Sequence, residues 1–391
     1  MRDDTGGSGV IGPRGDLGPG RSSARKLDPE PILPTPPPHS PLRMPAEWER
    51  HDATWIAWPH HEPDWPGKLG PIPWVYGEIA RVLHQHERVE ILCHDETVRE
   101  GAQQVLDAHG CRADHPRGGY RLHVVPNDRV WLRDSAPTFV HDARGAVEMV
   151  NWQFNAWAKY DNYARDERVG EAMERILRQK RHVPMRPDGQ GRVVLEGGGI
   201  ETNGAGLFLV TEEWLLSDVQ VRNPGLTRDD YERVFREWLG VRQTIWLGEG
   251  CVGDDTHGHI DDVARFTDET TVVLAFEEDP ADDENHRRSV DNWRRLEVAS
   301  GAGRAFRVVK LPFPRAVAMN AERLPASYAN FYIANGVCIV PTFNDPNDRR
   351  ALNTLAELMP EHEIVGIHAV DLVWGLGTLH CLSQQQPAAR R

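Results

Sequence analysis

A cysteine close to the end of the chain has the setting of a presented nucleophile. Cys381 follows the glycine-rich run Gly375-Leu-Gly-Thr-Leu-His, and glycine permits close approach of other groups and unusual backbone angles. A thiolate is a strong nucleophile once a nearby cation or a loop of backbone N–H groups lowers its pKa. The alternative is that the cysteine is a small buried hydrophobic residue. We adopt that interpretation for Cys93 and Cys338, because both lie in apolar, strand-like runs.

A segment rich in histidine and aspartate is the second chemical feature. It reads Asp254-Asp-Thr-His257-Gly-His259-Ile-Asp261. A histidine can protonate a leaving group and then deprotonate water near neutral pH. Asp261 would face the same way as His259 if the segment is extended. Two alternatives stay open: His257, His259 and Asp261 could ligate zinc or another divalent ion, or the segment is a charged structural loop.

A charged loop supplies a further carboxylate. Asp134 follows Trp131-Leu-Arg, and a carboxylate can accept two N–H groups of a guanidinium in a fork. Asp134 and Asp261 could therefore hold a planar guanidinium from two sides, with Trp131 covering its face. The alternative is a surface ion pair within the loop, which contributes little.

An acid before a glycine-rich turn could complete the site. Glu196 follows a strand-like residue and precedes three glycines, and it could orient His259 as the carboxylate of a catalytic triad does. The glycines lack the spacing of a nucleotide-binding loop. A cysteine, a histidine and several carboxylates together indicate hydrolysis of a guanidinium group through a covalent thiouronium.

The composition excludes several other classes of protein. The chain has 391 residues, of which 45 are basic and 59 acidic, so its net charge is −14; phosphate neutralisation on nucleic acid is therefore not expected. The five cysteines are scattered and none forms a CxxC pair, which favours a reducing compartment. No apolar run approaches the roughly 18 residues of a membrane span, and the first residues have no apolar signal region. We expect a cytoplasmic protein that binds neither nucleic acid nor membrane.

The sequence predicts an N-terminal arm followed by one domain. Residues 1–43 are rich in Gly, Pro, Ser and Arg and are expected to form a disordered arm. Residues 44–391 are expected to form a single catalytic domain. Within it, helical spacing at 96–108, 228–239 and 349–359 alternates with strand-like runs. Repeated units usually stack or close around an axis; if they close, their loops would bring the chemical residues together. The alternative is an ordinary α/β domain.

Ordered motifs along nearly the whole domain resemble the agmatine deiminase and bacterial-type peptidyl-arginine deiminase family of the guanidine-modifying superfamily. These motifs are Met44-Pro-Ala-Glu-Trp48-Glu, Ala53-Thr-Trp55-Ile-Ala-Trp58-Pro, Trp131-Leu-Arg-Asp134, Leu195-Glu-Gly-Gly, Arg222-Asn-Pro224, Gly258-His-Ile-Asp261, Ser327-Tyr-Ala-Asn330-Phe-Tyr and His380-Cys381. The resemblance implies an α/β fold: a five-bladed, pseudo-symmetric, pentein-like propeller of ββαβ units. It also implies a homodimer and no metal or organic cofactor.

The resemblance assigns a role to each candidate residue. Cys381 is the nucleophile and His259 the general acid and base. Asp134 and Asp261 bind the guanidinium, and Glu196 supports the histidine and the substrate. The resemblance also places Asn330 at a substrate site. Trp131 is expected to bind substrate because its ring could cover a guanidinium face.

The implied reaction converts agmatine to N-carbamoylputrescine and ammonia, a step toward putrescine and other polyamines. Agmatine-specific members often differ from this chain at Leu376, Thr378, Gly199 and Glu201, so a deiminase acting on peptidyl-arginine or another guanidine is the alternative. Free arginine would need a cation for its carboxylate, for which Arg129, Arg133 and Arg265 are candidates. A metal-dependent hydrolase is the remaining possibility.

Overall fold

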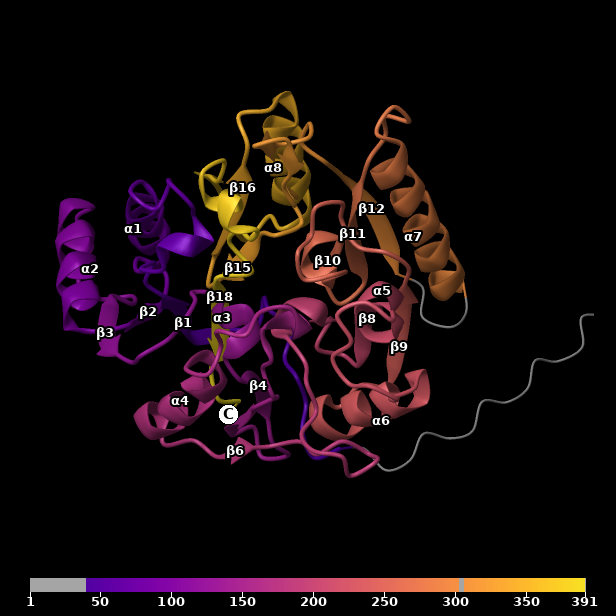
Figure 1. The fold of residues 1–391 in the computed structure, drawn as a ribbon, viewed down its shortest axis with the longest axis horizontal. Helices are drawn as coiled ribbons and strands as arrows, with labels where there is room; N and C mark the ends of the chain where they lie inside the picture. Colours follow the sequence, from indigo (N-terminus) through magenta and orange to yellow (C-terminus); the bar gives the residue numbers. More distant parts are fainter. Residues whose placement is uncertain (1–39, 302–305, 391) are drawn as a thin grey trace, which may run out of the picture. The chain divides into compact units, whose positions relative to one another are not determined.

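Five small mixed sheets carry the fold of residues 40–301 and 306–390, which the computed structural model describes (Figure 1). In each sheet one pair of neighbouring strands is antiparallel and the next pair is parallel. A parallel pair needs a crossover connection, usually a helix, and a helix separates the parallel strands in every unit. The predicted ββαβ units are confirmed.

Four of the units follow one another along the chain. The first contains β4 (Thr138–His141), β5 (Val147–Val150), α4 (Val169–Leu177) and β6 (Arg181–His182). The second contains β7 (Glu201–Thr202), β8 (Leu207–Thr211), α5 (Glu212–Leu216), α6 (Arg228–Leu239) and β9 (Gln243–Leu247). The third contains β10 (Ala264–Asp268), β11 (Thr271–Phe276), α7 (Asp283–Gly301) and β12 (Arg307–Pro312). The fourth contains β15 (Tyr332–Ala334), β16 (Val337–Thr342), α8 (Pro346–Leu358) and β17 (Glu363–His368).

The remaining sheet joins strands from both ends of the domain. The last strand, β18 (Ser383–Pro387), pairs antiparallel with β1 (His51–Ala57). The sheet then continues through β2 (Arg88–Cys93) and β3 (Tyr120–Val124), with α1 (Ile72–Leu83) and α2 (Glu96–Ala108) as crossovers. Because β18 begins two residues after Cys381, its pairing with β1 fixes the position of the candidate nucleophile.

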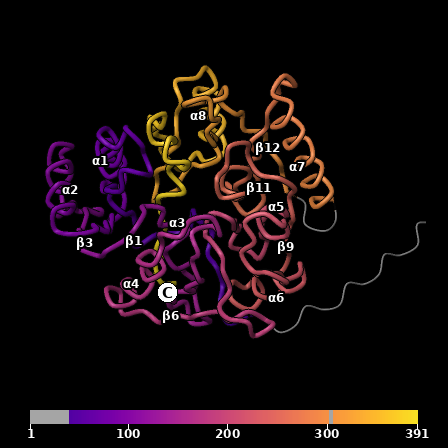
Figure 2. Tube along the Cα trace, in the orientation of Figure 1, coloured from indigo at the N-terminus to yellow at the C-terminus, as the bar shows by residue number. Residues whose placement is uncertain are grey.

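Two short elements lie outside the repeated pattern. The α3 turn (Leu132–Ser135) follows β3 and carries Asp134. A hairpin of β13 (Ala318–Met319) and β14 (Glu322–Arg323) precedes β15. Figure 2 traces the chain through the five units, from β1 in indigo to β18 in yellow.

The local sequence explains where α6 begins and ends. Thr227 and Asp230 form a capping box that satisfies the first free N–H groups, and Gly240 adopts the left-handed conformation that ends the helix, with φ of 70°. The apolar face, with Tyr231 and Phe235, is buried against β8. The structure has the helix at the residues that the spacing predicts. In α8 the helix begins at Pro346 rather than at 349, because Asp345 caps it and proline fits the first turn.

Most of the predicted arm, residues 1–43, lies outside the described residues. Within the described part, Arg43 forms an antiparallel backbone bridge with His141, and Leu42 is buried beside α6 residues. None of the helices in residues 40–301 and 306–390 is long and apolar enough to cross a membrane.

Candidate active site

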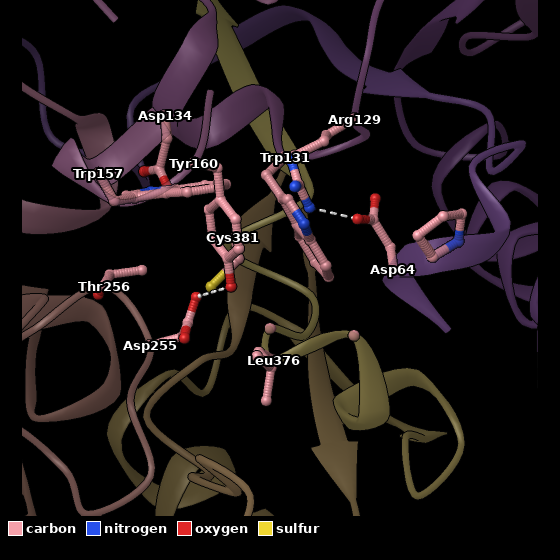
Figure 3. Close-up of a pocket in the computed structure, with 13 residues that line it drawn as sticks. Asp64, Arg129, Trp131, Asp134, Trp157, Tyr160, Asp255, Thr256, Leu376 and Cys381 are labelled. Atoms are coloured by element: carbon pink, nitrogen blue, oxygen red, sulfur yellow. Dashed lines mark hydrogen bonds and ion pairs between the residues drawn. The ribbon is translucent and has the colours of Figure 1, made fainter. Parts of the chain in front are cut away.

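Loops from several units meet at one cavity of about 210 Å³ (Figure 3). Trp131 and Asp134 come from the segment after β3, Trp157 from the loop after β5, Asp255 from the loop after β9, and Cys381 from the loop before β18. The structure thus brings Asp134 and Cys381, which are far apart in the sequence, to one cavity. The complete lining is Pro63, Asp64, Arg129, Trp131, Asp134, Trp157, Tyr160, Asp255, Thr256, Gly375, Leu376, Gly377 and Cys381.

Cys381 is held by hydrogen bonds on its backbone and on its thiol. The side-chain amide of Asn330 donates to Sγ at 3.0 Å. The amide oxygen of Asn330 accepts from the backbone N–H groups of His380 at 3.0 Å and Cys381 at 3.3 Å, and from the hydroxyl of Thr378 at 2.7 Å. The thiol itself donates to Oδ2 of Asp261 at 3.5 Å. Asn330 is fully buried and is not among the residues that line the cavity.

The turn before Cys381 needs glycines because two aromatic rings pack closely against it. A Cβ at Gly375 would lie 2.6 Å from the Trp65 ring, and one at Gly377 would lie 2.8 Å from the Trp131 ring. The left-handed conformation falls on Leu376, with φ of 68°, and not on either glycine. The glycines thus permit close packing of tryptophans against the nucleophile loop.

Asp134 is fixed by two donors at the wall of the cavity. The backbone N–H of Gly198 donates to Oδ1 at 2.9 Å, and the indole of Trp157 donates to Oδ2 at 2.9 Å. Burial raises the pKa of Asp134 to about 6, although His259 opposes the shift. Sequence reasoning missed Trp157, which has no acidic neighbour in the sequence to mark it.

His259 lies between two carboxylates. Its Nδ1 is 3.8 Å from Oδ1 of Asp134, and its Nε2 is 3.6 Å from Oε2 of Glu196. The ring also contacts the edge of Trp214 at 5.5 Å between centroids. Burial alone would lower the pKa of His259, but Asp134, Glu196 and Asp261 outweigh it and raise the pKa to about 9. The imidazole is therefore protonated at neutral pH.

Glu196 is a fully ionised anchor behind the histidine. Arg222 donates to its Oε1 at 3.0 Å and the Trp214 indole to its Oε2 at 2.7 Å. Burial opposes ionisation, but Arg222 and His259 lower the pKa of Glu196 to about 2. The glycines after Glu196 make room for this arrangement, since a Cβ at Gly198 would lie 2.6 Å from Nδ1 of His259.

Asp261 is connected to a buried network of charges. Nδ1 of His380 lies 2.8 Å from its Oδ2, and Nε2 of the same ring lies 2.9 Å from Oε2 of Glu47. Glu47 also accepts from Arg265 at 2.8 Å and from Arg133 at 3.3 Å. Burial alone would raise the pKa of Asp261, but the hydrogen bond from His380 lowers it. Its other oxygen, Oδ1, is buried and has no hydrogen-bond partner among the described residues.

The acids around Cys381 keep its thiol protonated. Burial, and then Asp261 and Asp262, raise the pKa of Cys381 well above its ordinary value. Burial and Asp261 likewise raise the pKa of Asp262, which accepts from Asn330 at 3.0 Å. Among the described residues, burial and these acids therefore outweigh any cation near the thiol.

A second set of charges lies where the cavity opens. Arg129 binds Asp64 and stacks over the Tyr160 ring at 4.4 Å. Asp255 accepts from the Tyr160 hydroxyl at 2.7 Å and forms an ion pair with Lys159. Figure 3 draws the Arg129–Asp64 ion pair and the Tyr160–Asp255 hydrogen bond as dashed lines, and the second of these lies close to Cys381. Sequence reasoning did not place Tyr160 or Asp255 in the site.

The residues of the alternative metal site do not form a ligand set. His257 binds the Ser217 hydroxyl through Nε2 at 2.9 Å. Among the described residues, the group whose ligand atoms could hold a metal ion is Asp261, Asp262 and Cys381, and it includes neither His257 nor His259.

Five ββαβ units around a buried cysteine, a histidine and paired acids define the fold and the site of the guanidine-modifying superfamily. Residues 43–387 match the Porphyromonas-type peptidyl-arginine deiminase family, and the chain belongs to this family. The predicted family and the predicted fold are both confirmed.

Curated relatives and solved structures agree with this assignment. The chain is similar to the agmatine deiminase of Pseudomonas aeruginosa, at 35% identity over 90% of this chain and 96% of the relative. It is also similar to the agmatine deiminase of Stutzerimonas stutzeri, at 37% identity over 88% and 95%. The solved agmatine deiminase of Enterococcus faecalis superposes with a TM-score of 0.79, at 28% identity over 89% of this chain and 96% of the other.

Proposed function

We propose that this protein is an agmatine deiminase, a hydrolase that converts agmatine and water to N-carbamoylputrescine and ammonia. The observation that carries the proposal is that Cys381 and Asp134 line one cavity of about 210 Å³. Behind them, Asp261 lies 3.5 Å from the Cys381 thiol and His259 lies 3.8 Å from Asp134. The similarity to curated agmatine deiminases over most of the chain supports the same substrate.

The guanidinium group is bound by the two aspartates. Asp134 lines the cavity, and Asp261 has a buried oxygen without a partner among the described residues. A carboxylate on each side can accept the paired N–H groups of a planar guanidinium. Trp131, which also lines the cavity, covers the face of the cation.

The substrate activates the nucleophile. Buried acids raise the pKa of Cys381, so a guanidinium bound beside Sγ brings the positive charge that favours the thiolate. The thiol proton passes to Asp261, to which the thiol donates at 3.5 Å, and from there to solvent, so that Asp261 holds the guanidinium as a carboxylate. The thiolate then attacks the guanidinium carbon, and a C–S bond forms.

His259 transfers the remaining protons. It is protonated at neutral pH because its pKa is raised to about 9, and it donates a proton to the departing nitrogen. Ammonia leaves and an S-alkylthiouronium remains on Cys381. The neutral imidazole then accepts a proton from water as the water attacks the same carbon. The hydroxyl of the tetrahedral intermediate then loses its proton to solvent as the C–S bond breaks, the ureido product leaves and the thiolate is regenerated.

The far end of the substrate is bound at Asp255. Its partner Lys159 has a side chain that is 40% exposed, so the ammonium of agmatine can replace it at low cost. A free arginine would need a cation for its carboxylate. Arg133 and Arg265 are buried with Glu47, and Arg129 is paired with Asp64, which favours agmatine over arginine.

Two features of the proposed function concern the whole molecule. We propose a cytoplasmic location, which the free state of all five cysteines suits, and a homodimer, for which the family resemblance is the support. Light scattering on the purified protein measures the mass directly.

A substrate comparison tests the proposal. Ammonia release is measured with agmatine, free L-arginine and a peptidyl-arginine side by side, with EDTA present. We expect ammonia from agmatine alone, and Cys381→Ser to reduce it by at least about a thousandfold while agmatine still binds. Release only from another guanidine would contradict agmatine as substrate and leave the mechanism standing. Loss of activity in EDTA, or near wild-type activity of Cys381→Ser, would contradict the mechanism.

A further inference from the structure

Three potential metal ligands converge at the nucleophile. The thiol of Cys381 and the carboxylates of Asp261 and Asp262 present ligand atoms that all lie within 4.8 Å of one another. All three residues are buried, with at most 7% of any of them exposed. A thiolate with two carboxylates is a ligand set of the kind that zinc accepts.

The separation of the sulfur and one oxygen fits tetrahedral zinc. Zinc binds thiolate sulfur at about 2.3 Å and carboxylate oxygen at about 2.0 Å, so two such ligands in a tetrahedron lie about 3.5 Å apart. Sγ of Cys381 and Oδ2 of Asp261 are 3.5 Å apart. The first two ligands therefore need no rearrangement to bind the ion.

Neighbouring side chains orient both carboxylates. His380 contacts Oδ2 of Asp261 at 2.8 Å, and Asn330 donates to Oδ1 of Asp262 at 3.0 Å. Hydrogen bonds of this kind to metal-binding carboxylates fix the ligands and commonly accompany metal sites in proteins. Oδ1 of Asp261, buried and without a partner among the described residues, is a further acceptor for a cation.

The local charge also favours a cation. Oδ2 of Asp261 lies 3.5 Å from Sγ of Cys381, and a carboxylate oxygen of Asp262 lies within 4.8 Å of both atoms. A divalent ion compensates this excess of acidic groups, as the guanidinium of a substrate does.

We propose that the active site binds one zinc ion through Cys381, Asp261 and Asp262, and that this ion inhibits the enzyme. On binding, the thiol releases its proton to solvent, a Zn–S bond forms, the carboxylates of Asp261 and Asp262 bind as anions, and no electrons are transferred. Zinc then occupies both the nucleophile and an acid that holds the substrate. The inhibition rests on the proposed function, whereas the binding of zinc does not.

This zinc site differs from the alternative catalytic metal site of His257, His259 and Asp261. That site would use His257, whose Nε2 is bound to Ser217. A metal on Cys381 removes the nucleophile, so the ion blocks deimination and does not assist it.

Metal binding by the full-length chain, without any turnover, tests the proposal. Zinc alone is titrated by calorimetry, and cobalt alone is added to detect the near-ultraviolet band of a cobalt–thiolate bond. We expect one ion per chain and a thiolate band. Cys381→Ser should abolish the band and weaken zinc binding by at least about 100-fold, and Asp262→Asn should weaken it by about 10-fold. Cys111→Ser, which alters a cysteine outside the cavity, should bind like the wild type.

Two outcomes would overturn the site. Zinc binding of equal strength in wild type and Cys381→Ser would remove the thiolate from the ligand set. Unchanged affinity in Asp262→Asn, with the protein folded by circular dichroism, would remove the third ligand. In the active enzyme, agmatine should compete with zinc. An inactive protein that still shows the Cys381-dependent band would contradict the proposed function and leave the metal site intact.

Discussion

The side-chain amide of Asn330 donates a hydrogen bond to the thiol of Cys381, with 3.0 Å between Nδ2 and Sγ. The oxygen of the same amide accepts from the backbone N–H of Cys381 at 3.3 Å. One side chain therefore fixes both the backbone and the thiol of the candidate nucleophile. Asn330 is fully buried and is absent from the cavity lining, so its geometry suits positioning of the nucleophile better than contact with substrate.

Replacement of Asn330 should slow the chemistry without weakening substrate binding. Asn330→Ala removes the donor to Sγ and the acceptor for the backbone, and hydrogen bonds of this kind contribute about 1–3 kcal/mol when a buried partner is left unsatisfied. We expect kcat with agmatine to fall roughly 10- to 100-fold, with KM nearly unchanged. Thr378→Val, which removes only the hydroxyl bound to the Asn330 oxygen, should have a smaller effect. A raised KM with unchanged kcat would show instead that Asn330 binds the substrate.

The pH dependence of kcat/KM should be bell-shaped. Asp134 must be ionised to hold a guanidinium, and its pKa is raised to about 6, so activity falls as the pH drops through this value. His259 must be protonated to release ammonia, and its pKa is raised to about 9, so activity falls as the pH rises through that value. Initial rates at low agmatine concentration between pH 5 and pH 10 check the two limbs, because kcat/KM reports the free enzyme. A profile that is flat on the acidic side would contradict the role of Asp134.

Neutralising Glu196 should shift both limbs of that profile to lower pH. Glu196 raises the pKa of His259 and that of Asp134, so Glu196→Gln lowers both. Trp214→Phe is the matched control, because it removes the indole donor to Glu196 and leaves the charge in place. Arg222 loses its buried partner in Glu196→Gln, so the melting temperature is measured alongside the rates. If both limbs of the pH profile stay at the same pH in a folded Glu196→Gln variant, Glu196 does not influence the pKa of His259.

Local motifs single out the candidate catalytic residues, because each is marked by its own neighbours. Cys381 follows a glycine-rich turn, Asp134 follows a tryptophan, and Glu196 precedes three glycines. The structure brings Cys381 and Asp134 to one cavity and Glu196 to His259. Helix 228–239 was equally predictable, since its apolar spacing, its capping box and its terminal glycine are all local.

Contacts between distant segments were not predictable in this way. His380 bridges Asp261 and Glu47, and Glu47 lies 333 positions earlier in the chain than His380. The strand β18 has no apolar alternation, because its buried residues are one Ser, three Gln and one Pro. Gln385 is satisfied by Arg133 at 2.6 Å and Gln386 by Trp55 at 2.9 Å. Such polar partners exist only after the fold has formed.

Trp157 was missed for a related reason. Ala156, Trp157 and Ala158 are all left-handed, with φ of 50°, 60° and 54°, although none is a glycine that would mark such a turn. The Asn155 side chain accepts from the backbone N–H of Ala158 and holds the turn. This unusual backbone directs the Trp157 indole to Asp134.

Trp157→Phe should therefore raise the pKa of Asp134 and move the acidic limb of the profile to higher pH. The indole donor lowers the pKa of Asp134, and phenylalanine keeps an aromatic ring without an N–H group. One hydrogen bond to a charged group contributes about 1.5–3 kcal/mol, which raises the pKa by roughly 1 to 2, so kcat/KM at neutral pH should fall roughly 2- to 15-fold. Trp131→Phe has no such bond to lose and should leave the acidic limb where it is. An unchanged limb in Trp157→Phe would show that the Gly198 donor alone holds Asp134.

Two glycine-to-alanine substitutions compare a glycine packed against the catalytic residues with one in a helix away from them. In Gly198→Ala the new Cβ would lie 2.6 Å from Nδ1 of His259 and 2.9 Å from Oδ1 of Asp134. Both side chains must move, and displacement of catalytic groups by about 1 Å can reduce the rate 100-fold, while overpacking costs about 1–3 kcal/mol of stability. In Gly101→Ala, within α2, nothing lies within 4 Å of the new Cβ. Because alanine favours a helix over glycine by about 1 kcal/mol, this control should melt at a higher temperature with full activity. Normal kcat/KM in Gly198→Ala would mean that His259 and Asp134 are not held as closely against this glycine as the structure places them.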